Sequence, residues 1–439
     1  MKKLILILSI IAGTSHGLSV SAQQDSIWTL EKCINYSFER NIQIRKSVLS
    51  NQKSGLYSDQ AKAQRLPSAS GSIGQNFNWS KNTSGGSGFT GSSGSSYSVN
   101  TGITIYNASR LSNLIKQAEL DMEVGKYSLE TTKESISLNI LNAFLQILYA
   151  EEQVKNSQKQ IESTTGELNL AAERLSLKSI SISDYAQVKS QLASEKLTLA
   201  NSESQLSITK INLMQLMELP MNPNFNVEQP DLGASLNQNR IPDVKTVYET
   251  ALSIKPQVKG AAVNKKIAEI DEKVARSGYF PTLSASAGIS SGYSTTATDI
   301  YFNQLNNSIR PSAGFTLSIP IYQKKQIKTS IAVAKIGYQD AELSETDTKN
   351  QLRKNIEQAC LDVTSAQIEY EATIEKYKAT KESAALAKEK FTQGMINSVD
   401  YVVSKTNLIV AESELLQSKF NLIFSYKILD FYMGIPLSL

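Results

Sequence analysis

The sequence contains one histidine, two cysteines and ten prolines in 439 residues. Its single histidine, His16, lies in a predicted signal peptide, so the processed chain would contain no imidazole. Ser-His-acid and Cys-His catalysis and most zinc sites require an imidazole, which excludes these classes. Cys33 and Cys360 lie in helical patterns far apart in the sequence, and we expect both to be buried apolar residues. We expect no enzymatic activity, no cofactor and no metal site.

The N-terminus has the composition of a secretory signal peptide. Lys2 and Lys3 precede an apolar run over residues 4–12, and Ala22 ends a small-residue cleavage motif, so residues 1–22 are expected to be removed. The apolar run is too short to cross a bilayer, which disfavours a membrane anchor. The full chain has 45 basic and 41 acidic residues, and this small excess gives no reason to expect nucleic acid as a partner.

A proline-free stretch over residues 107–219 carries an apolar residue at nearly every seventh position. Such a seam is typical of helices that pack along a neighbour in a left-handed supercoil. A short polar segment, Ser181–Ser183, interrupts the seam, so the stretch is predicted to be a helical hairpin. Its first arm of about 70 residues would be about 100 Å long. The seam consists of Ile147, Val154, Ile161, Leu168, Leu175, Tyr185, Leu192, Leu199, Leu206 and Leu213.

The whole pattern occurs twice. Residues 23–220 form a first repeat and residues 244–439 a second, joined by a linker at 221–243 that is rich in Pro and Asn. Pro67 matches Pro281 at an offset of 214 residues, and the offset becomes 216 beyond the loop of the predicted β-hairpin. Each repeat is predicted to contain a helix, then a β-hairpin at about 68–106 or 282–319, then a long helical hairpin at 107–219 or 321–433.

The two predicted β-hairpins alternate apolar residues at odd positions with Ser, Thr, Asn and Gly at even positions. Strands of about 11 residues have the length that crosses a bilayer at a tilt. Trp79, Tyr97 and Tyr293 fall where an aromatic girdle would meet the membrane surface. A soluble sandwich, with the apolar faces packed together, is the alternative interpretation.

A membrane-spanning sheet must close, because lipid cannot satisfy the hydrogen bonds of an open edge. Four strands are too few, since single-chain barrels begin at about eight strands, whereas three copies would supply about twelve. The sequence therefore predicts a mainly α protein with a tandem repeat, in which two β-hairpins per chain contribute to a 12-stranded trimeric barrel. The long coiled-coil helical hairpins would form an α-barrel.

Two local motifs agree with this interpretation. Phe391–Val402 (FTQGMINSVDYV) places an aromatic residue, Gly394 and Asp400 at a predicted helix–turn–helix. Phe315–Tyr322 (FTLSIPIY) ends a strand with a proline before the next helix. Together with the signal peptide and the duplication, these motifs resemble the TolC-like outer-membrane efflux proteins, the outer-membrane factors of tripartite export systems. The resemblance covers essentially the whole processed chain.

The resemblance implies a homotrimer in the outer membrane of a Gram-negative bacterium, with the helical part in the periplasm. Its partners would be outer-membrane lipid, a periplasmic adaptor (membrane fusion) protein and an inner-membrane pump or exporter. The function would be a passive exit duct for efflux or type I secretion. A structural coiled-coil surface fibre or adhesin with a β membrane anchor is the alternative, and the duplication with two separated hairpins argues against it.

Asp184 and Asp400 head the two returning helices. In a trimer they would place six carboxylates around the narrow end of the tunnel, as a periplasmic gate ring that favours cations. The alternative is a structural role, in which Ser183 or Ser398 caps the helix and the acid in its first turn meets the positive helix end. The resembled family has a further acid one turn after the second aspartate, where this chain has Val403.

A second candidate site is a groove for the adaptor. By the resemblance, Gln393, Gly394 and Met395 are where an adaptor hairpin would bind. The matching residues of the first repeat are Leu177, Lys178 and Ser179, and Lys178 departs from the glycine of the pattern. The alternative is that Gly394 only permits a tight turn.

Overall fold

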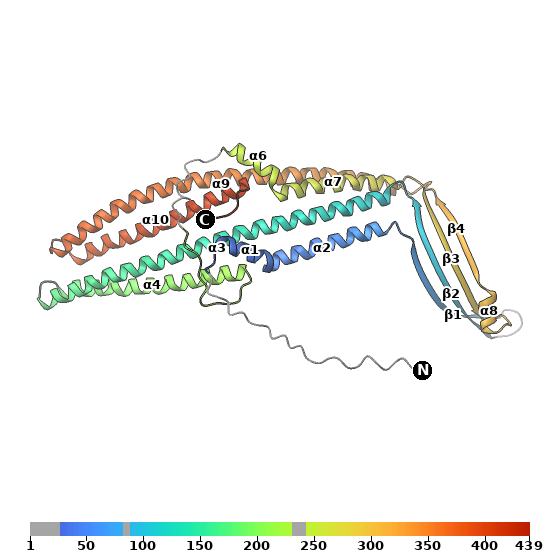
Figure 1. Ribbon diagram of the computed structural model, residues 1–439, viewed down its shortest axis with the longest axis horizontal. Helices are drawn as coiled ribbons and strands as arrows, with labels where there is room; N and C mark the ends of the chain where they lie inside the picture. The colour runs from blue at the N-terminus through green and yellow to red at the C-terminus, as the bar shows by residue number, and fades with distance from the viewer. Residues whose placement is uncertain (1–26, 82–87, 231–242) are drawn as a thin grey trace.

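The computed structural model describes residues 27–81, 88–230 and 243–439, so the predicted signal peptide and most of the predicted linker lie outside the described residues. The molecule is elongated, with one sheet at one end and long helices extending away from it (Figure 1). Among the described helices, none combines the length and apolar character needed to cross a bilayer. The elements are α1 (Leu30–Arg40), α2 (Ile42–Ala63), β1 (Ser68–Lys81), β2 (Phe89–Tyr106), α3 (Arg110–Ser176), α4 (Ile182–Leu216), α6 (Val244–Ile254), α7 (Pro256–Ser277), β3 (Thr282–Ser294), α8 (Tyr301–Asn307), β4 (Arg310–Ser318), α9 (Gln326–Thr392) and α10 (Ser398–Met433).

The helices repeat as the sequence predicts. α3 and α9 each have 67 residues, which corresponds to about 100 Å of helix. α3 pairs with α4 and α9 with α10, so each repeat forms one long helical hairpin (Figure 1). α2 packs on α3, whereas α7 packs on both α3 and α9 and thereby joins the two repeats. The predicted fold class, long helical hairpins with short β-hairpins in a tandem repeat, is confirmed for the single chain.

The four strands form one antiparallel sheet in the order β1-β2-β3-β4. The strands have 14, 18, 13 and 9 residues, so they vary more than the expected length of about 11 residues. Odd positions pair with odd positions across the sheet, as in Ile73 with Tyr97, Val99 with Ile289 and Ala285 with Phe315. The apolar side chains therefore share one face, and most of the large ones are exposed. The alternative of a sandwich is wrong, because the described strands form a single sheet and no second sheet packs on this face.

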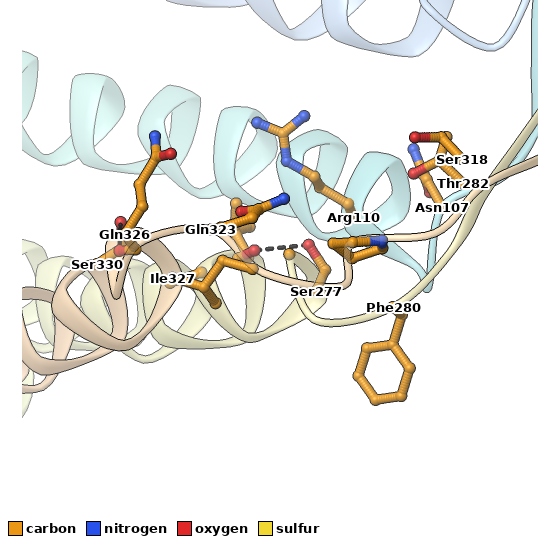
Figure 2. A pocket seen from close by; sticks show the side chains of 14 residues that line it. Asn107, Arg110, Ser277, Phe280, Thr282, Ser318, Gln323, Gln326, Ile327 and Ser330 are labelled. Atoms are coloured by element: carbon orange, nitrogen blue, oxygen red, sulfur yellow. Dashed lines mark hydrogen bonds between the residues drawn. The ribbon is translucent and has the colours of Figure 1, made fainter.

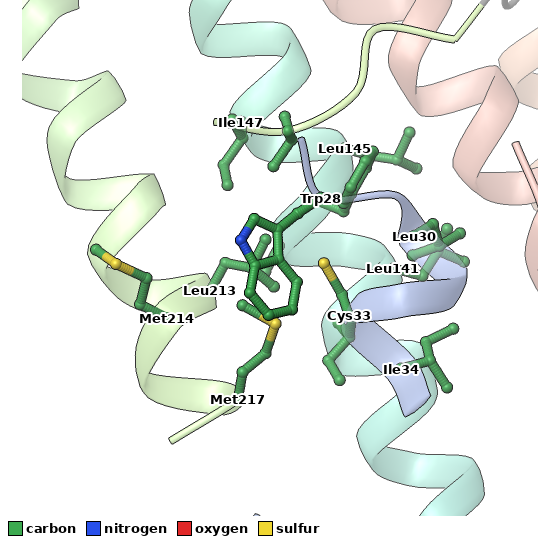
Figure 3. Close-up of a cluster of buried hydrophobic side chains, with 14 of the residues drawn as sticks. Trp28, Leu30, Cys33, Ile34, Leu141, Leu145, Ile147, Leu213, Met214 and Met217 are labelled. Atoms are coloured by element: carbon green, nitrogen blue, oxygen red, sulfur yellow. The ribbon is translucent and has the colours of Figure 1, made fainter. Parts of the chain in front are cut away.

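The main hydrophobic core lies in the middle of the molecule, away from the sheet. Figure 3 shows Trp28 between Cys33 on α1 and Leu213 on α4, with Met217 just beyond the end of α4. An isolated parallel bridge from Trp28 to Val227 ties the start of the described chain to the segment after α4. Cys33 and Cys360 are both buried and free, as expected from their apolar surroundings. Burial raises the pKa of the Cys33 thiol to about 12, which keeps it protonated and unreactive.

Candidate functional site at the hairpin tips

The turns of the two helical hairpins lie at the end of the molecule farthest from the sheet (Figure 1). Each turn has the same backbone conformation, with Lys178 at φ +56° and Gly394 at φ +75°. The N–H of Ser179 donates to the carbonyl of Arg174 at 2.9 Å, and that of Met395 donates to Lys390 at 2.8 Å. These bonds are typical of a Schellman motif, which ends a helix with one left-handed residue. Lys178 therefore preserves the turn although it replaces the glycine.

Both returning helices begin with a side-chain cap, but not with the predicted one. The N–H of Asp184 donates to the Ser181 hydroxyl at 3.0 Å, and the N–H of Ser181 donates back to the Asp184 carboxylate at 3.3 Å. The N–H of Asp400 donates to the Asn397 side chain at 2.8 Å. The predicted caps at Ser183 and Ser398 are wrong, because α4 begins at Ile182 and α10 at Ser398, whereas a cap is the residue that precedes the first helical residue.

Asp184 and Asp400 have different surroundings. The Asp184 carboxylate also accepts the backbone N–H of Ser398 at 3.4 Å, so it links the two hairpins of the chain. The hydrogen bonds from Ser398 and then Ser181 lower the pKa of Asp184, which keeps it ionised. Asp400 is exposed.

The predicted adaptor-groove residues all lie at the surface of the tips. Leu177, Lys178 and Ser179 are exposed in the first turn, and Gln393, Gly394 and Met395 are exposed in the second. A Cβ at Gly394 would meet no atom within 4 Å, so the surface beside this residue is open. Leu177 and Met395 are the only large apolar side chains among these six residues, and both are exposed.

A buried charged network joins the two hairpins a few turns above the tips. The Lys405 ammonium on α10 lies 2.9 Å from Glu167 on α3 and 3.6 Å from Glu195 on α4. The Thr164 hydroxyl bonds Glu195 and accepts from Lys405, and the Tyr401 hydroxyl donates to Glu167 at 2.6 Å. Lys405 and Glu195 are buried, and Thr164 is fully enclosed. We call these five residues the inter-hairpin network.

The electrostatics of the inter-hairpin network favour an ionised Glu167. Burial by itself would raise the pKa of Glu167, but hydrogen bonds from Tyr401 and Lys405, with the charges of Lys405 and Lys388, outweigh it and lower the pKa. Burial, followed by the bond to Glu167, raises the pKa of the Tyr401 phenol, so the phenol remains the donor. Removing one partner of such a buried pair typically costs about 3–5 kcal/mol, because a charge stays buried without compensation.

Two further contacts lie nearer the turns, one between the two hairpins and one within the second hairpin. The Arg174 guanidinium at the end of α3 donates to the carbonyl of Thr392 at 2.6 Å. The rings of Phe391 and Tyr401 stack with 4.9 Å between centroids and 4° between planes. Sequence reasoning missed these contacts and the inter-hairpin network. Apart from Thr164 with Glu195 and Phe391 with Tyr401, the partners are more than 200 residues apart. The only signal was that Tyr401 and Lys405 share one helix face.

At the opposite end of the molecule, the three predicted girdle aromatics have different surroundings. Trp79 is exposed and stacks on Phe77 with 6.3 Å between centroids. Tyr97 and Tyr293 instead contact Tyr301 of α8: the hydroxyls of Tyr97 and Tyr301 lie 2.6 Å apart, and the rings of Tyr293 and Tyr301 lie 4.9 Å apart. The hairpin loop thus contains a short helix that covers part of the sheet, which the sequence did not predict.

These features agree with a channel-type protein: a sheet whose apolar face is largely exposed, joined to duplicated helical hairpins whose tips are linked. The chain belongs to the outer membrane efflux protein family, whose model matches residues 34–218 and 247–434. The expected family and its location in the outer membrane are thereby confirmed. The family is one of transport proteins and not of enzymes, and it fits the efflux interpretation better than a surface fibre or adhesin.

Solved structures share the fold. A membrane protein from Pseudomonas aeruginosa has a TM-score of 0.76 at 14% identity, with 93% of each chain covered. The CmeC outer membrane channel of Campylobacter jejuni has a TM-score of 0.75 at 16% identity, covering 92% of this chain and 85% of CmeC. The open state of the MtrE outer membrane channel of Neisseria gonorrhoeae also has 0.75 at 16% identity, covering 93% and 90%. These low identities establish the fold alone, and no curated protein matches the sequence.

Proposed function

We propose that three copies of this chain assemble into the passive exit duct of a tripartite efflux or type I secretion system. Twelve strands would close into a barrel in the outer membrane, and the helical hairpins would form a tunnel across the periplasm. A periplasmic adaptor would join the tips to an inner-membrane pump or exporter, which supplies the energy. The chain itself would catalyse no reaction.

The two faces of the sheet support this proposal. The odd face exposes Ile73, Phe315 and other large apolar side chains, which lipid would cover. Apart from Tyr106 at the end of β2 and Arg310 at the start of β4, the even positions of the described strands carry only Ser, Thr, Asn and Gly. Arg310 is the only charged side chain among them. Within the chain β1 and β4 are the edges of the sheet, so their outer backbone groups require strands from neighbouring copies.

The single observation that carries the proposal is the unequal burial of α2 and α7, which occupy matching places in the two repeats. Leu49 and Leu56 on α2 are 63% and 70% exposed, whereas their matches on α7, Val263 and Ile270, are each 3% exposed. α7 is covered because it lies between the two long helices α3 and α9, while α2 packs on only one long helix, α3.

A neighbouring copy offers the surface that α2 lacks. On α9, Ile336 and Leu343 are exposed, whereas the matching residues on α3, Leu120 and Tyr127, are partly buried. α7 lies close to Tyr127, since a Cβ at Gly260 would be 3.5 Å from the Tyr127 Cβ. Placing α2 of one copy on α9 of the next would repeat this contact and close a ring. Burying each such Leu or Ile contributes about 1.5–3 kcal/mol.

We further propose that Asp184 and Asp400 form a ring of carboxylates at the narrow end of the duct. The lowered pKa of Asp184 supports this assignment, because the group stays charged near neutral pH. The exposed groove residues Leu177–Ser179 and Gln393–Met395 would receive the adaptor, and the open surface at Gly394 leaves room for close approach of another backbone.

Cysteine cross-linking in outer-membrane fractions tests the assembly. α2 runs toward the sheet and α9 away from it, so the α7–α3 contact predicts that Leu56 faces Ile336 of the next copy. Oxidation of a chain carrying Leu56→Cys and Ile336→Cys should give a covalent trimer. A chain carrying Leu56→Cys and Val410→Cys is the control and should remain a monomer on a denaturing gel. A monomer from both chains would contradict the ring.

Planar-bilayer recording tests the gate ring. The variant with Asp184→Asn and Asp400→Asn should lose cation preference, because neutral amides replace the carboxylates. A cation preference equal to that of the wild type would leave only the capping role for both residues.

A further inference from the structure

Carboxylates are missing from the part of the chain around the junction between sheet and helices. Residues 60–118, 273–298 and 310–339 contain no Asp or Glu, although the whole chain has 41 acidic residues. The same three ranges contain Lys62, Arg65, Lys81, Arg110, Lys116, Lys273, Arg276, Arg310, Lys324, Lys325, Lys328 and Lys335. The junction is therefore strongly basic, whereas the rest of the chain, with 41 acidic and 33 basic residues, has an excess of acid.

The basic side chains nearest the sheet lack acidic partners. Lys62, Lys273 and Arg276, which end α2 and α7, form ion pairs with glutamates of the helices. Arg110, which begins α3, and Lys324, Lys325 and Lys328 at the start of α9 are exposed. In the described part of the chain, no carboxylate lies within ion-pair distance of these four residues. We call Arg110, Lys324, Lys325 and Lys328 the basic collar.

The fold itself does not require this charge. Lys324 and Lys325 have left-handed backbones with φ +47° and +66°, and the matching residues of the first repeat, Ala108 and Ser109, have φ +51° and +63°. Uncharged residues thus form the same turn. Lysine has no special preference for a left-handed backbone, so the paired lysines need an explanation other than the turn.

The basic collar borders an exposed apolar band. Ile321 is 94% exposed, and Tyr322, Ile319 and Tyr279 are exposed beside it. Figure 2 shows Arg110 at a polar pocket where α3, α7 and α9 meet the strands, with Phe280 pointing away from the pocket. Aromatic and aliphatic side chains next to lysines and arginines are typical of a membrane–water boundary.

We propose that the basic collar binds the anionic headgroups of phospholipids in the periplasmic leaflet of the outer membrane. This inference rests on the proposed function, which places the sheet in the bilayer and the helices in the periplasm. The band at Ile321 would then lie among acyl chains, and the lysines a few residues later would reach the phosphates. Unpaired cations attract anionic lipid only within about 8–10 Å of the surface, which this position satisfies.

A lipid-selectivity measurement on the full chain tests the proposal. The protein is reconstituted in phosphatidylcholine vesicles that contain spin-labelled phosphatidylglycerol or spin-labelled phosphatidylcholine, and the lipid bound at the protein surface is measured. We expect the wild type to enrich phosphatidylglycerol, and higher salt to reduce this enrichment. In the variant with Lys324→Gln, Lys325→Gln and Lys328→Gln, the enrichment should fall by up to about fivefold per charge removed.

A matched variant with Lys378→Gln, Lys381→Gln and Lys390→Gln removes three exposed lysines from the tip half of the same helix. It should enrich phosphatidylglycerol as the wild type does. Equal binding of both lipids by the wild type, or unchanged selectivity in the collar variant, would overturn the basic collar. A wrong membrane placement would give a different result from a wrong basic collar. In that case neither labelled phosphatidylglycerol nor labelled phosphatidylcholine would show a protein-bound population.

Discussion

The two repeats share one backbone but place different side chains at its strained positions. Lys178 and Glu218 have φ +56° and +55° in the first repeat, and glycines stand at the matching positions of the second, Gly394 at φ +75° and Gly434 at φ +76°. A left-handed backbone costs a non-glycine residue roughly 1–2 kcal/mol. The two repeats therefore share the positions and backbone conformations of their helix ends, although the residue types at these positions differ.

The inter-hairpin network differs even more between the repeats. Glu167 and Glu195 of the first repeat match Ser383 and Ala411 of the second, whereas Lys405 has an exact counterpart in Lys189. In a closed ring, Lys189 of one copy would face Ser383 and Ala411 of the next, where no acid is available. The hairpins of one chain are therefore joined by buried charges, and hairpins of neighbouring chains would lack that link.

Breaking the network should have the largest effect. Lys405→Met leaves Glu195 buried without a cation and Glu167 with only the exposed Lys388, 3.5 Å away. We expect a loss of about 3–5 kcal/mol in the free energy that keeps the hairpins together. Hydrogen exchange of the α10 amides near Lys405 measures this opening. Lys189→Met, at the matching exposed position, is the control and should change the free energy by no more than about 0.5 kcal/mol. Equal effects of the two substitutions would contradict the difference between the repeats, because Lys405 would then stabilise the tips no more than Lys189 does.

Acid should weaken the links at the tips of one chain. The folded-state pKa values of Glu167 and Asp184 lie below their ordinary values of 4.5 and 3.8, so ionisation stabilises the folded tips. This contribution is complete above pH 4.5 and is lost as the pH falls through the lowered values. Hydrogen exchange at the tips should therefore accelerate at acidic pH. With Glu167→Gln and Asp184→Asn in place, this pH dependence should largely disappear; if it persisted, other groups would be responsible.

The turn glycine offers a smaller test. Gly394→Ala should destabilise the second tip by about 1–2 kcal/mol, because alanine resists the left-handed backbone. Lys178→Gly should instead stabilise the first tip by up to about 1 kcal/mol, as strain is relieved at some cost in unfolded-chain entropy. Local unfolding measured by limited proteolysis of the turns checks both. We expect the two substitutions to change the stability of their tips in opposite directions. A loss of stability in both variants would mean that the Lys178 side chain makes a stabilising contact.

The smallest expected difference separates the two aspartates. Asp184→Asn removes the charge of a carboxylate that accepts hydrogen bonds from the N–H groups of Ser181 and Ser398. The substitution should lower the stability of the folded tip by about 1 kcal/mol. Asp400→Asn changes an exposed residue in a helix that Asn397 already caps, and it should lower the stability of the tip by only a few tenths of a kcal/mol. Hydrogen exchange in the first turns of α4 and α10 distinguishes them. A larger loss at Asp400 would contradict the assigned contacts.

The long helices and the strand faces were predictable because they follow from periodicity alone. The seam from Ile147 to Leu213 and the alternation from Ala69 to Trp79 encode the elements locally. The duplication also predicted which residues of the two tips correspond. Periodicity cannot report contacts between residues distant in sequence, so the bonds from Glu167 to Tyr401 and Lys405 were missed.

Local chemistry was less predictable where two candidates lay close together. Ser181 and Ser183 lie two residues apart in the polar segment where the sequence predicts the start of the first returning helix, and only the observed start at Ile182 selects Ser181 as its cap. The tyrosines at 97 and 293 alternate correctly for a membrane-facing position, yet α8 folds back on them through Tyr301. A short loop helix leaves little periodic signal, because seven residues cover only about two turns.

The central claim is that the bare faces of this chain are completed by copies of itself. The most direct test is the mass of the particle extracted from outer membranes in mild detergent, measured by native mass spectrometry. The account predicts the mass of three processed chains. The mass of a single chain, with the apolar faces of α2 and α9 still accessible to a water-soluble thiol reagent at Leu56→Cys and Ile336→Cys, would contradict it.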